Sequence, residues 1–360
     1  MKVLIACGGT GGHLFPGLAV AETLQARQHQ VQLLVSAKAV DSMALSALTN
    51  GSKRSSITVR AMSAVGFTGW RGLIRFCVRS AHAVRDCVSV CREFEPDAVL
   101  GMGGFTSAPA VLAARGRRGV ATLIHESNAV PGKANRLAGK LADHIAVGLA
   151  ECAQHFGRKP VTVTGTPIRA ALRRVNGAHR WLGLEPERKT ILVMGGSQGA
   201  HAINEAMAAA LPGLNEWKER TQFVHLGGVR DELLVREAYA KNGFNAIVMS
   251  FCSEMELAYS AADIVVARSG AATLTELAAF GLPAILIPYA QATGNHQFHN
   301  ARVFERAGAA RITEPGELSS TIAGLLADDE ARAGMAVAAR SLAVENAAER
   351  IADLVEAYAN

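Results

Sequence analysis

The chain has 360 residues, of which 49% are hydrophobic and 19% are charged, and its formal net charge is +6. This length suggests about two domains, and the apolar content allows a buried core in each, which excludes global disorder. The charge is uneven: residues 1–165 hold 19 Lys and Arg against 9 Asp and Glu, whereas residues 166–360 hold 18 against 22. The basic first half predicts an anionic partner, with nucleic acid, a phospholipid surface and a phosphorylated substrate as candidates. Ordinary surface variation is the alternative.

Two uncharged segments raise the question of a signal peptide or a membrane span. The N-terminal apolar run stops at Cys7, short of the roughly 7–15 apolar residues that a signal peptide needs, and residues 98–114 are interrupted by three glycines and a proline. We therefore predict neither a signal peptide nor a transmembrane segment. The six cysteines include no Cys-x-x-Cys pair, which favours buried, reduced thiols.

In chain order, a strand, a glycine-rich turn and a helix open the first half, and the same order returns twice. The expected elements are a strand at Lys2–Ala6, a turn at Gly8–Gly12, a helix from near Pro16, strands at Val31–Val35 and Ala98–Leu100, a turn at Gly101–Gly104 and a strand at Val161–Gly165. The second half opens with a strand at Thr190–Met194, a turn at Gly195–Gly199 and a helix from about Ala200. Further strands are expected at Phe223–Leu226, Ala246–Met249, Ile264–Val266 and Ala284–Ile287, and the tail at Glu317–Tyr358 is helical.

This repetition predicts an α/β protein of two doubly wound parallel-sheet domains in tandem. We place the first domain at residues 1–165 and the second at residues 166–344. Residues 345–360 are expected to form a C-terminal helix that packs back on the first domain.

Glycine-rich turns between a strand and a helix suit anion binding, because backbone N–H groups and the helix N-terminus face the ligand. The alternative is that the glycines only supply positive φ for tight turns. The dinucleotide-binding fingerprint fails, since Leu14 stands where its third glycine would be and Ser36 rather than an acidic residue ends the second strand. No Gly-Lys-Ser/Thr and no Asp-x-Asp occurs, so we expect neither a cofactor nor a metal. A departing nucleotide diphosphate would then be stabilised by backbone N–H groups, hydroxyls and Arg.

Glu276 follows the small residues 269–273 at the start of a predicted helix. Its carboxylate could accept hydrogen bonds from the two vicinal hydroxyls of a ribose. Equally, it could only complement the positive end of the helix dipole.

Seven stretches together resemble the MurG family of peptidoglycan N-acetylglucosaminyltransferases. They are Gly8–Gly17, Gly101–Ser107, His125–Asn128, Gly165–Arg169, Gly195–Ala200, Arg268–Glu276 and His296–Ala301, in family order over almost the whole chain. The resemblance implies the GT-B fold, with two Rossmann-like domains and a cleft between them. It also implies an inverting transfer of GlcNAc from UDP-GlcNAc to the C4 hydroxyl of MurNAc in undecaprenyl-pyrophosphoryl-MurNAc-pentapeptide, which converts lipid I to lipid II.

The resemblance also implies roles for individual residues. The donor would contact Thr10, Gly11, Gly12, Asn128, Arg169, Ser197, Cys252, Ala271, Ala272, Thr273, Leu274, Thr275, Glu276 and Gln297, with Glu276 on the ribose hydroxyls. The acceptor pyrophosphate would lie at Gly9, Gly103 and Gly104. His13 is the candidate general base, since histidine suits this role near neutral pH, and Glu126 is the second candidate.

Some positions depart from the family pattern. Ser127 stands where the family usually has Gln, Thr166 replaces a common Asn, and Cys252 replaces an aliphatic residue. The segment 290–295, before Gln297, is one residue longer than the pattern.

The implied partners are UDP-GlcNAc, lipid I and an anionic membrane surface, with no nucleic acid. The protein is expected on the cytoplasmic face of the inner membrane as a peripheral protein. The expected docking segment is residues 66–79, in which Arg71, Arg75 and Arg79 are four residues apart beside apolar residues. An ordinary amphipathic helix is the alternative. Two other function classes remain open, namely a sugar-nucleotide epimerase on the same fold and a non-catalytic nucleotide- or phospholipid-binding module.

Overall fold

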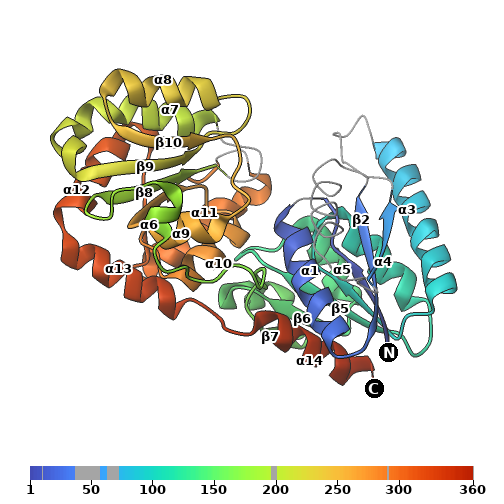
Figure 1. Cartoon of the computed structure of the whole chain (residues 1–360). Coiled ribbons are helices and arrows are strands. Elements are labelled where there is room, and N and C mark those ends of the chain that lie inside the picture. Colours follow the sequence, from blue (N-terminus) through green and yellow to red (C-terminus); the bar gives the residue numbers. More distant parts are fainter. Residues whose placement is uncertain (10, 37–56, 63–72, 196–200, 290–291, 360) are drawn as a thin grey trace. The chain divides into compact units, whose positions relative to one another are not determined.

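The computed structural model describes residues 1–9, 11–36, 57–62, 73–195, 201–289 and 292–359. The chain divides into two compact units, of which one is Met1–Arg169 with Val344–Asn360 and the other is Ala170–Ala343. Each unit has one parallel β-sheet with helices packed on it (Figure 1). This is the doubly wound α/β architecture that the repeated order of strand, turn and helix predicts.

The sheet of the first unit has the strand order β3-β2-β1-β4-β5-β6-β7, and all neighbouring strands are parallel. The strands are β1 (Lys2–Ala6), β2 (Gln30–Ser36), β3 (Thr58–Met62), β4 (Ala98–Gly101), β5 (Ala121–Glu126), β6 (His144–Val147) and β7 (Val161–Val163). The helices are α1 (Gly11–Ala26), α3 (Leu73–Phe94), α4 (Gly104–Arg115), α5 (Lys133–Leu141), the 3₁₀ helix η2 (Ala150–Phe156) and α14 (Ala347–Ala359).

Alternate residues of β1 build the core on opposite faces of this sheet. Val3 and Ile5 pack with α1 and α14, whereas Leu4 and Ala6 pack with α3 and α4. All four side chains are buried. Burial on both faces explains why the strand appears in the sequence as an uninterrupted apolar run.

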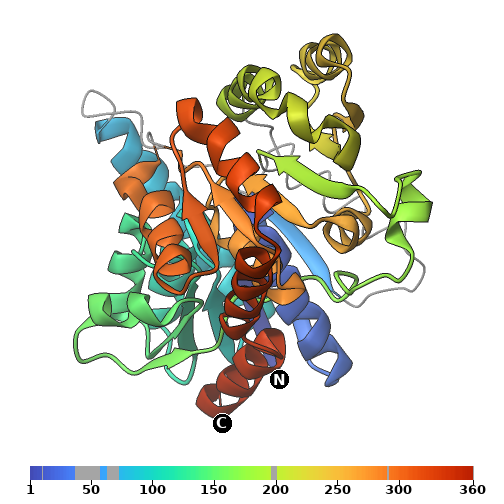
Figure 2. The same ribbon diagram turned by 90° about the vertical axis from the view of Figure 1, so that its left-hand side faces the viewer.

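The C-terminal helix α14 lies beside α1, and both chain termini lie near the same end of the first unit (Figures 1 and 2). Ile351 and Val355 of α14 belong to the core of this unit. Arg27 donates hydrogen bonds to Asp353 and Glu356 at 2.7 and 2.9 Å. The last helix is therefore held by apolar contacts and by ion pairs at its rim.

The sheet of the second unit has the order β10-β9-β8-β11-β12-β13, again with all neighbours parallel. Its strands are β8 (Lys189–Met194), β9 (Thr221–Leu226), β10 (Asn245–Met249), β11 (Ile264–Ala267), β12 (Ala284–Leu286) and β13 (Ala310–Ile312). Its helices are α6 (Ala178–Leu182), α7 (His201–Ala210), α8 (Glu232–Asn242), α9 (Met255–Ala261), α10 (Ala271–Phe280), α11 (His296–Arg306), α12 (Leu318–Ala327) and α13 (Asp329–Ser341), with 3₁₀ helices η3 (Leu211–Arg220), η4 (Thr293–Asn295) and η5 (Pro315–Glu317).

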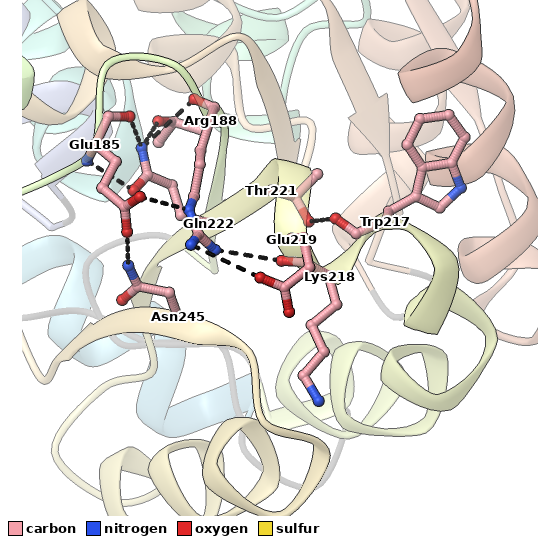
Figure 3. Close-up of polar contacts among 9 residues, drawn as sticks. Glu185, Arg188, Trp217, Lys218, Glu219, Thr221, Gln222 and Asn245 are labelled. Carbon is pink, nitrogen blue, oxygen red and sulfur yellow. Dashed lines mark hydrogen bonds and ion pairs between the residues drawn. The ribbon is translucent and has the colours of Figure 1, made fainter.

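A polar cluster fixes the segment that leads into β8 to the amino-terminal ends of β9 and β10 (Figure 3). The buried Gln222 accepts a hydrogen bond from the backbone N–H of Glu185 at 3.0 Å and donates one to its carbonyl at 2.7 Å. The Glu185 carboxylate accepts hydrogen bonds from Arg188 at 2.8 Å and Asn245 at 3.2 Å. The chain therefore enters the second sheet along a defined path.

Most of these elements were predicted from the sequence, but the predicted start of the first helix was wrong. The first helix begins at Gly11 rather than near Pro16, and Pro16 lies inside it. Proline is favoured in a first helical turn, but here the helix extends five residues before it and loses one backbone hydrogen bond at that point. The strands β3, β5, β6 and β13 were not among the expected elements.

The buried His225 makes the stability of the second unit depend on pH. Its Nδ1 lies 3.0 Å from the Tyr239 hydroxyl and its Nε2 lies 3.0 Å from Asn204 Oδ1. Burial lowers the pKa of His225 from 6.5 to about 3. Between these values the unfolded chain binds more protons than the folded chain, so the free energy of unfolding must fall as the pH falls below 6.5.

Urea unfolding at pH values from 6 to 4.5 would measure this dependence. We expect the His225→Gln variant to lose one linked proton, which lowers the slope of unfolding free energy against pH by about 1.4 kcal/mol per pH unit. Equal slopes for the parent and the variant would contradict the assignment.

Candidate functional site

Each unit has a topological switch point, where the chain leaves neighbouring central strands toward opposite edges of the sheet. In the first unit this point lies between β1 and β4, and in the second between β8 and β11. Ligands of doubly wound sheets bind outside the carboxyl ends of the strands at such points. The glycine-rich turns after β1 and β4, the glycine-rich segment after β8 and the segment before Glu276 follow these four strands; residues 196–200 of the third lie outside the described part.

The turns of the first unit require glycine for geometric reasons. Gly9, Gly103 and Gly104 have φ values of +123°, +106° and +73°. A Cβ on Gly9 would lie 2.9 Å from the Phe105 ring, and one on Gly103 would lie 2.6 Å from Nδ1 of His13. The close approach and the backbone conformation both exclude a side chain here.

Two hydroxyls at the start of α4 bind these turns together, and the sequence analysis did not single them out. The backbone N–H of Gly8 donates to Thr106 Oγ1 at 3.0 Å, and that of Gly103 donates to Ser107 Oγ at 2.8 Å. Both hydroxyl side chains are fully buried. These two N–H groups are therefore engaged within the protein, and Thr106 and Ser107 set the spacing of the turns after β1 and β4.

His13 lies in the first turn of α1, directly after Gly11 and Gly12, while Thr10 falls outside the described residues. Its Nδ1 lies 3.1 Å from the carbonyl oxygen of Met102 in the turn after β4. A carbonyl can only accept, so Nδ1 carries the proton and the lone pair of the neutral ring is on Nε2. The structure thus orients His13 with a defined tautomer, which suits a general base.

Glu126 ends β5 and is only 2% exposed. Its carboxylate accepts four hydrogen bonds, from the backbone N–H and side-chain amide of Asn128 at 3.0 and 2.8 Å, from the N–H of Gly132 at 3.1 Å and from Asn135 at 3.0 Å. These bonds fix Asn128 and the turn before α5. The arrangement favours a positioning role for Glu126 over direct proton transfer.

Arg169 is the last residue of the first unit in the chain before Ala170. The central carbon of its guanidinium lies 5.0 Å from the centroid of the Phe15 ring, within the range of a cation–π interaction. Its Nε is buried and has no hydrogen-bond partner among the residues that the structure describes. Such a buried donor is unusual in a folded protein and marks Arg169 as a candidate ligand contact.

In the second unit, residues 271–276 form the start of α10, immediately after Gly270. Ala271, Ala272 and Thr273 are its first three residues, with Leu274 and Thr275 following, so their backbone N–H groups include those that an α-helix leaves unpaired at its N-terminus. Ser269 and Asn300 brace this turn: the Ser269 hydroxyl donates to the Gln297 carbonyl at 2.7 Å, and Asn300 donates to the Ser269 carbonyl at 3.1 Å.

Glu276 is partly buried and lies in the second turn of α10. The hydroxyl of the fully buried Tyr259 in α9 donates to its Oε2 at 2.6 Å. This short bond to a carboxylate orients the side chain. Tyr259 was not predicted, because nothing in its sequence context distinguishes it from an ordinary core residue.

The remaining donor candidates lie on separate elements of the second unit. Gln297, in the first turn of α11, accepts a hydrogen bond from the Tyr289 N–H at 2.9 Å through Oε1. Cys252 is buried in the loop after β10. Ser197 falls outside the described residues, so its placement is not tested.

No helix in the described part of the chain is long and apolar enough to cross a membrane. Within the same residues, no three His, Cys, Asp or Glu side chains gather as metal ligands would.

Comparison with known proteins places both halves in one family. Residues 3–147 match the glycosyltransferase family 28 N-terminal domain, and residues 190–354 match the glycosyltransferase family 28 C-terminal domain. A relative from Syntrophotalea carbinolica is 41% identical over 98% of this chain and 97% of its own length. It is named UDP-N-acetylglucosamine–N-acetylmuramyl-(pentapeptide) pyrophosphoryl-undecaprenol N-acetylglucosamine transferase.

Solved structures support the same placement. The crystal structure of Acinetobacter baumannii MurG matches with a TM-score of 0.77 and 28% identity over 99% of both chains. A UDP-GlcNAc 2-epimerase from Neisseria meningitidis matches with a TM-score of 0.71 at 16% identity, covering 99% of this chain and all of its own, which shows a shared fold alone. The chain has the GT-B-like fold of two Rossmann-like domains, and it belongs to glycosyltransferase family 28, in the MurG family of N-acetylglucosamine transferases.

Proposed function

We infer that this protein transfers GlcNAc from UDP-GlcNAc to lipid I and so forms lipid II in peptidoglycan synthesis. The observation that carries this inference is the full-length identity to transferases of that name, at 41% in the case above. The switch-point turns of both sheets, with His13 oriented at one of them, supply the chemistry that such a reaction needs. The epimerase alternative is supported only by a shared fold.

In this reaction His13 takes the proton from the C4 hydroxyl of the MurNAc unit through Nε2. The acceptor pyrophosphate lies at Gly9, Gly103 and Gly104, and the first unit is the acceptor domain. The donor binds mainly to the second unit, where the N-terminus of α10 and the turn that contains Ser197 stabilise the departing UDP. No metal is required for this step.

The donor contacts of the remaining predicted residues are part of the same proposal. Glu276 holds the ribose hydroxyls, Gln297 holds GlcNAc hydroxyls, and Cys252 contacts the uracil through its backbone. The donor contacts that we propose for the first unit are Thr10, Gly11, Gly12, Asn128 and Arg169.

Incubation with labelled UDP-GlcNAc and a short-chain lipid I analogue separates the candidate functions. A transferase forms a labelled lipid-linked disaccharide only when the acceptor is present. An epimerase would change or release the sugar without the acceptor, and a binding module would form no product.

Glu276→Ala is expected to weaken UDP binding by about 1–3 kcal/mol, because a charged hydrogen-bond acceptor for the ribose is lost. Isothermal titration calorimetry measures this as an affinity about 5- to 150-fold lower. Tyr259→Phe should cause a smaller loss, since it leaves the carboxylate in place but removes the hydroxyl that orients it.

Glu237→Ala, an exposed carboxylate on α8, is the matched control and should bind UDP as the parent does. The same titration in EDTA tests the metal-independent binding. Unchanged affinity in the Glu276 variant, or loss of parent binding in EDTA, would contradict the proposed donor site.

We further propose that the protein works as a peripheral protein on the cytoplasmic face of the inner membrane, because its lipid acceptor resides there. Residues 66–79 remain the proposed docking segment; residues 66–72 lie outside the described part, and α3 begins at Leu73. Arg75 and Arg79 are four residues apart in the sequence of this helix. Through lipid II supply, the activity would support cell wall growth, cell shape and division in the cell cycle.

The triple variant Arg71/Arg75/Arg79→Glu is expected to lose sedimentation with anionic vesicles, because each Arg near the surface contributes about 1 kcal/mol. UDP-GlcNAc affinity should be unchanged. The control is the triple variant Arg118/Lys133/Arg158→Glu, which changes three exposed residues of the same basic half and alters the net charge equally. This control variant should still sediment with the vesicles. If the first triple variant sediments as well as the parent at low salt, residues 66–79 are not the docking segment.

A further inference from the structure

A surface cavity of about 270 Å³, open to solvent, lies beside the amino-terminal ends of strands in the second sheet, away from their carboxyl ends. It is formed by residues at the start of β8, before β11, after α10 and along α13, and α10 and α13 pack against each other (Figure 1). The charged side chains that line it are Arg174, Lys189, Asp263, Asp329, Arg332 and Arg340. Four cations therefore face two carboxylates.

Both carboxylates are already engaged by two of the four cations. Lys189 Nζ lies 3.5 Å from Asp263 and 3.9 Å from Asp329. Arg332 forms an ion pair with Asp329 as well. Neither Arg174 nor Arg340 forms an ion pair with any residue that the structure describes. The cavity therefore holds two guanidinium groups whose charge its own carboxylates do not neutralise.

Neighbouring groups hold these two guanidinium groups in place. Arg174 donates a hydrogen bond to the carbonyl of Phe280 at the end of α10. Arg340 packs over Gly281, where an added Cβ would collide with its side chain. Both arginine side chains are exposed, so an anion from solvent can reach them. An anion bound by both groups would satisfy their planar arrays of donors.

The two arginines lie next to the two chain connections between the units. Arg174 is five residues beyond Arg169, where the first unit ends, and Arg340 is three residues before Ala343, where the second unit ends. Both connections therefore reach the second unit at one cavity. A ligand held by both arginines would fix these connecting segments to each other.

We propose that this cavity binds a multiply charged phosphate-type anion between Arg174 and Arg340, and that the bound anion restrains the two segments connecting the units. More than one negative charge is needed, because two guanidinium groups lack a counterion. The proposal does not rest on the transferase activity, since the cavity is built from second-unit residues away from the switch point.

Hydrogen–deuterium exchange of the full chain with inorganic pyrophosphate as the probe tests this site. Saturating UDP occupies the donor site, and chloride matches the ionic strength in samples without pyrophosphate. At a pyrophosphate concentration ten times the dissociation constant, we expect exchange in residues 170–177 and 334–343 to slow about tenfold. Protection confined to these peptides distinguishes pyrophosphate binding at this cavity from pyrophosphate binding at the glycine-rich turns of the first unit.

The Arg174→Gln/Arg340→Gln variant should lose this protection and bind pyrophosphate at this cavity at least tenfold more weakly. Arg236→Gln is the matched control, because Arg236 also donates to a backbone carbonyl but is paired with Glu232 outside the cavity. It should retain the protection. Arg340→Gln alone, at an exposed residue, serves as a second variant if the double variant does not fold.

Two results would overturn the proposal. One is the absence of protection in residues 170–177 and 334–343 of the parent chain with pyrophosphate. The other is equal protection in the parent and in the folded arginine variants. Protection by acetate equal to that by pyrophosphate would contradict the requirement for a multiply charged anion.

Discussion

Replacing His13 by alanine is expected to lower turnover about 10²- to 10⁴-fold while UDP-GlcNAc still binds, because a general base contributes that much to proton transfer. The geometry supports this expectation, since the Met102 carbonyl accepts a hydrogen bond from the Nδ1–H, which leaves the lone pair of the neutral ring on Nε2. Initial rates with a lipid I analogue, together with calorimetry for the donor, measure both parts of the prediction.

A second variant separates base catalysis from positioning. His13→Asn keeps a side-chain donor for the Met102 carbonyl but has no ring nitrogen that could accept the acceptor's proton. It should be as slow as His13→Ala, whereas a purely positioning role predicts that it is clearly faster. Near-normal turnover in either variant would remove His13 from the mechanism and return attention to Glu126.

Gly103→Ala is expected to reduce turnover about 100-fold, since a displacement near 1 Å of a reacting group has that effect. The new Cβ would lie 2.6 Å from Nδ1 of His13, so the ring must move away from the Met102 carbonyl. The backbone of Gly103, at φ 106° and ψ −179°, is also in a region almost restricted to glycine. We expect a loss of stability of about 1–3 kcal/mol from this strain alone.

Gly119→Ala distinguishes the collision from the strain. Gly119 also has a positive φ, of +76°, but a Cβ there would meet no atom within 4 Å. This variant should lose stability and keep its turnover per folded molecule. If the turnover of Gly103→Ala equals that of Gly119→Ala at equal folded fractions, the turn after β4 does not position His13.

The sequence by itself determined the class of fold, because the signals that define it are local. Apolar runs such as Val3–Ala6 and Ile191–Met194 are buried in parallel sheets, and the glycine-rich turn after the first of them contains Gly9, whose φ is positive. Ordered motifs along the chain identified the family, which the full-length identity to named transferases confirms. The resemblance to that family selected His13 and Gly103 as candidates, and the position of Glu276 near the start of a predicted helix suggested a ribose contact.

The tertiary structure decided how those candidates are held, because their partners come from distant parts of the chain. His13 is oriented by a carbonyl 89 residues away, and Glu276 by the Tyr259 hydroxyl 17 residues before it. Glu126, the second candidate base, accepts four hydrogen bonds in the folded chain, two of them from Asn128 and the others from Gly132 and Asn135.

Two further features could be seen only in the folded chain. They are the start of the first helix at Gly11 and the cavity beside Arg174 and Arg340. A local pattern reports burial and turn chemistry, since these act between near neighbours in sequence. Hydrogen-bond partners, charge balance in a cavity and the tautomer of a histidine depend instead on which strand ends lie side by side. The order of strands in the two sheets sets that arrangement, and no single segment of the sequence carries it.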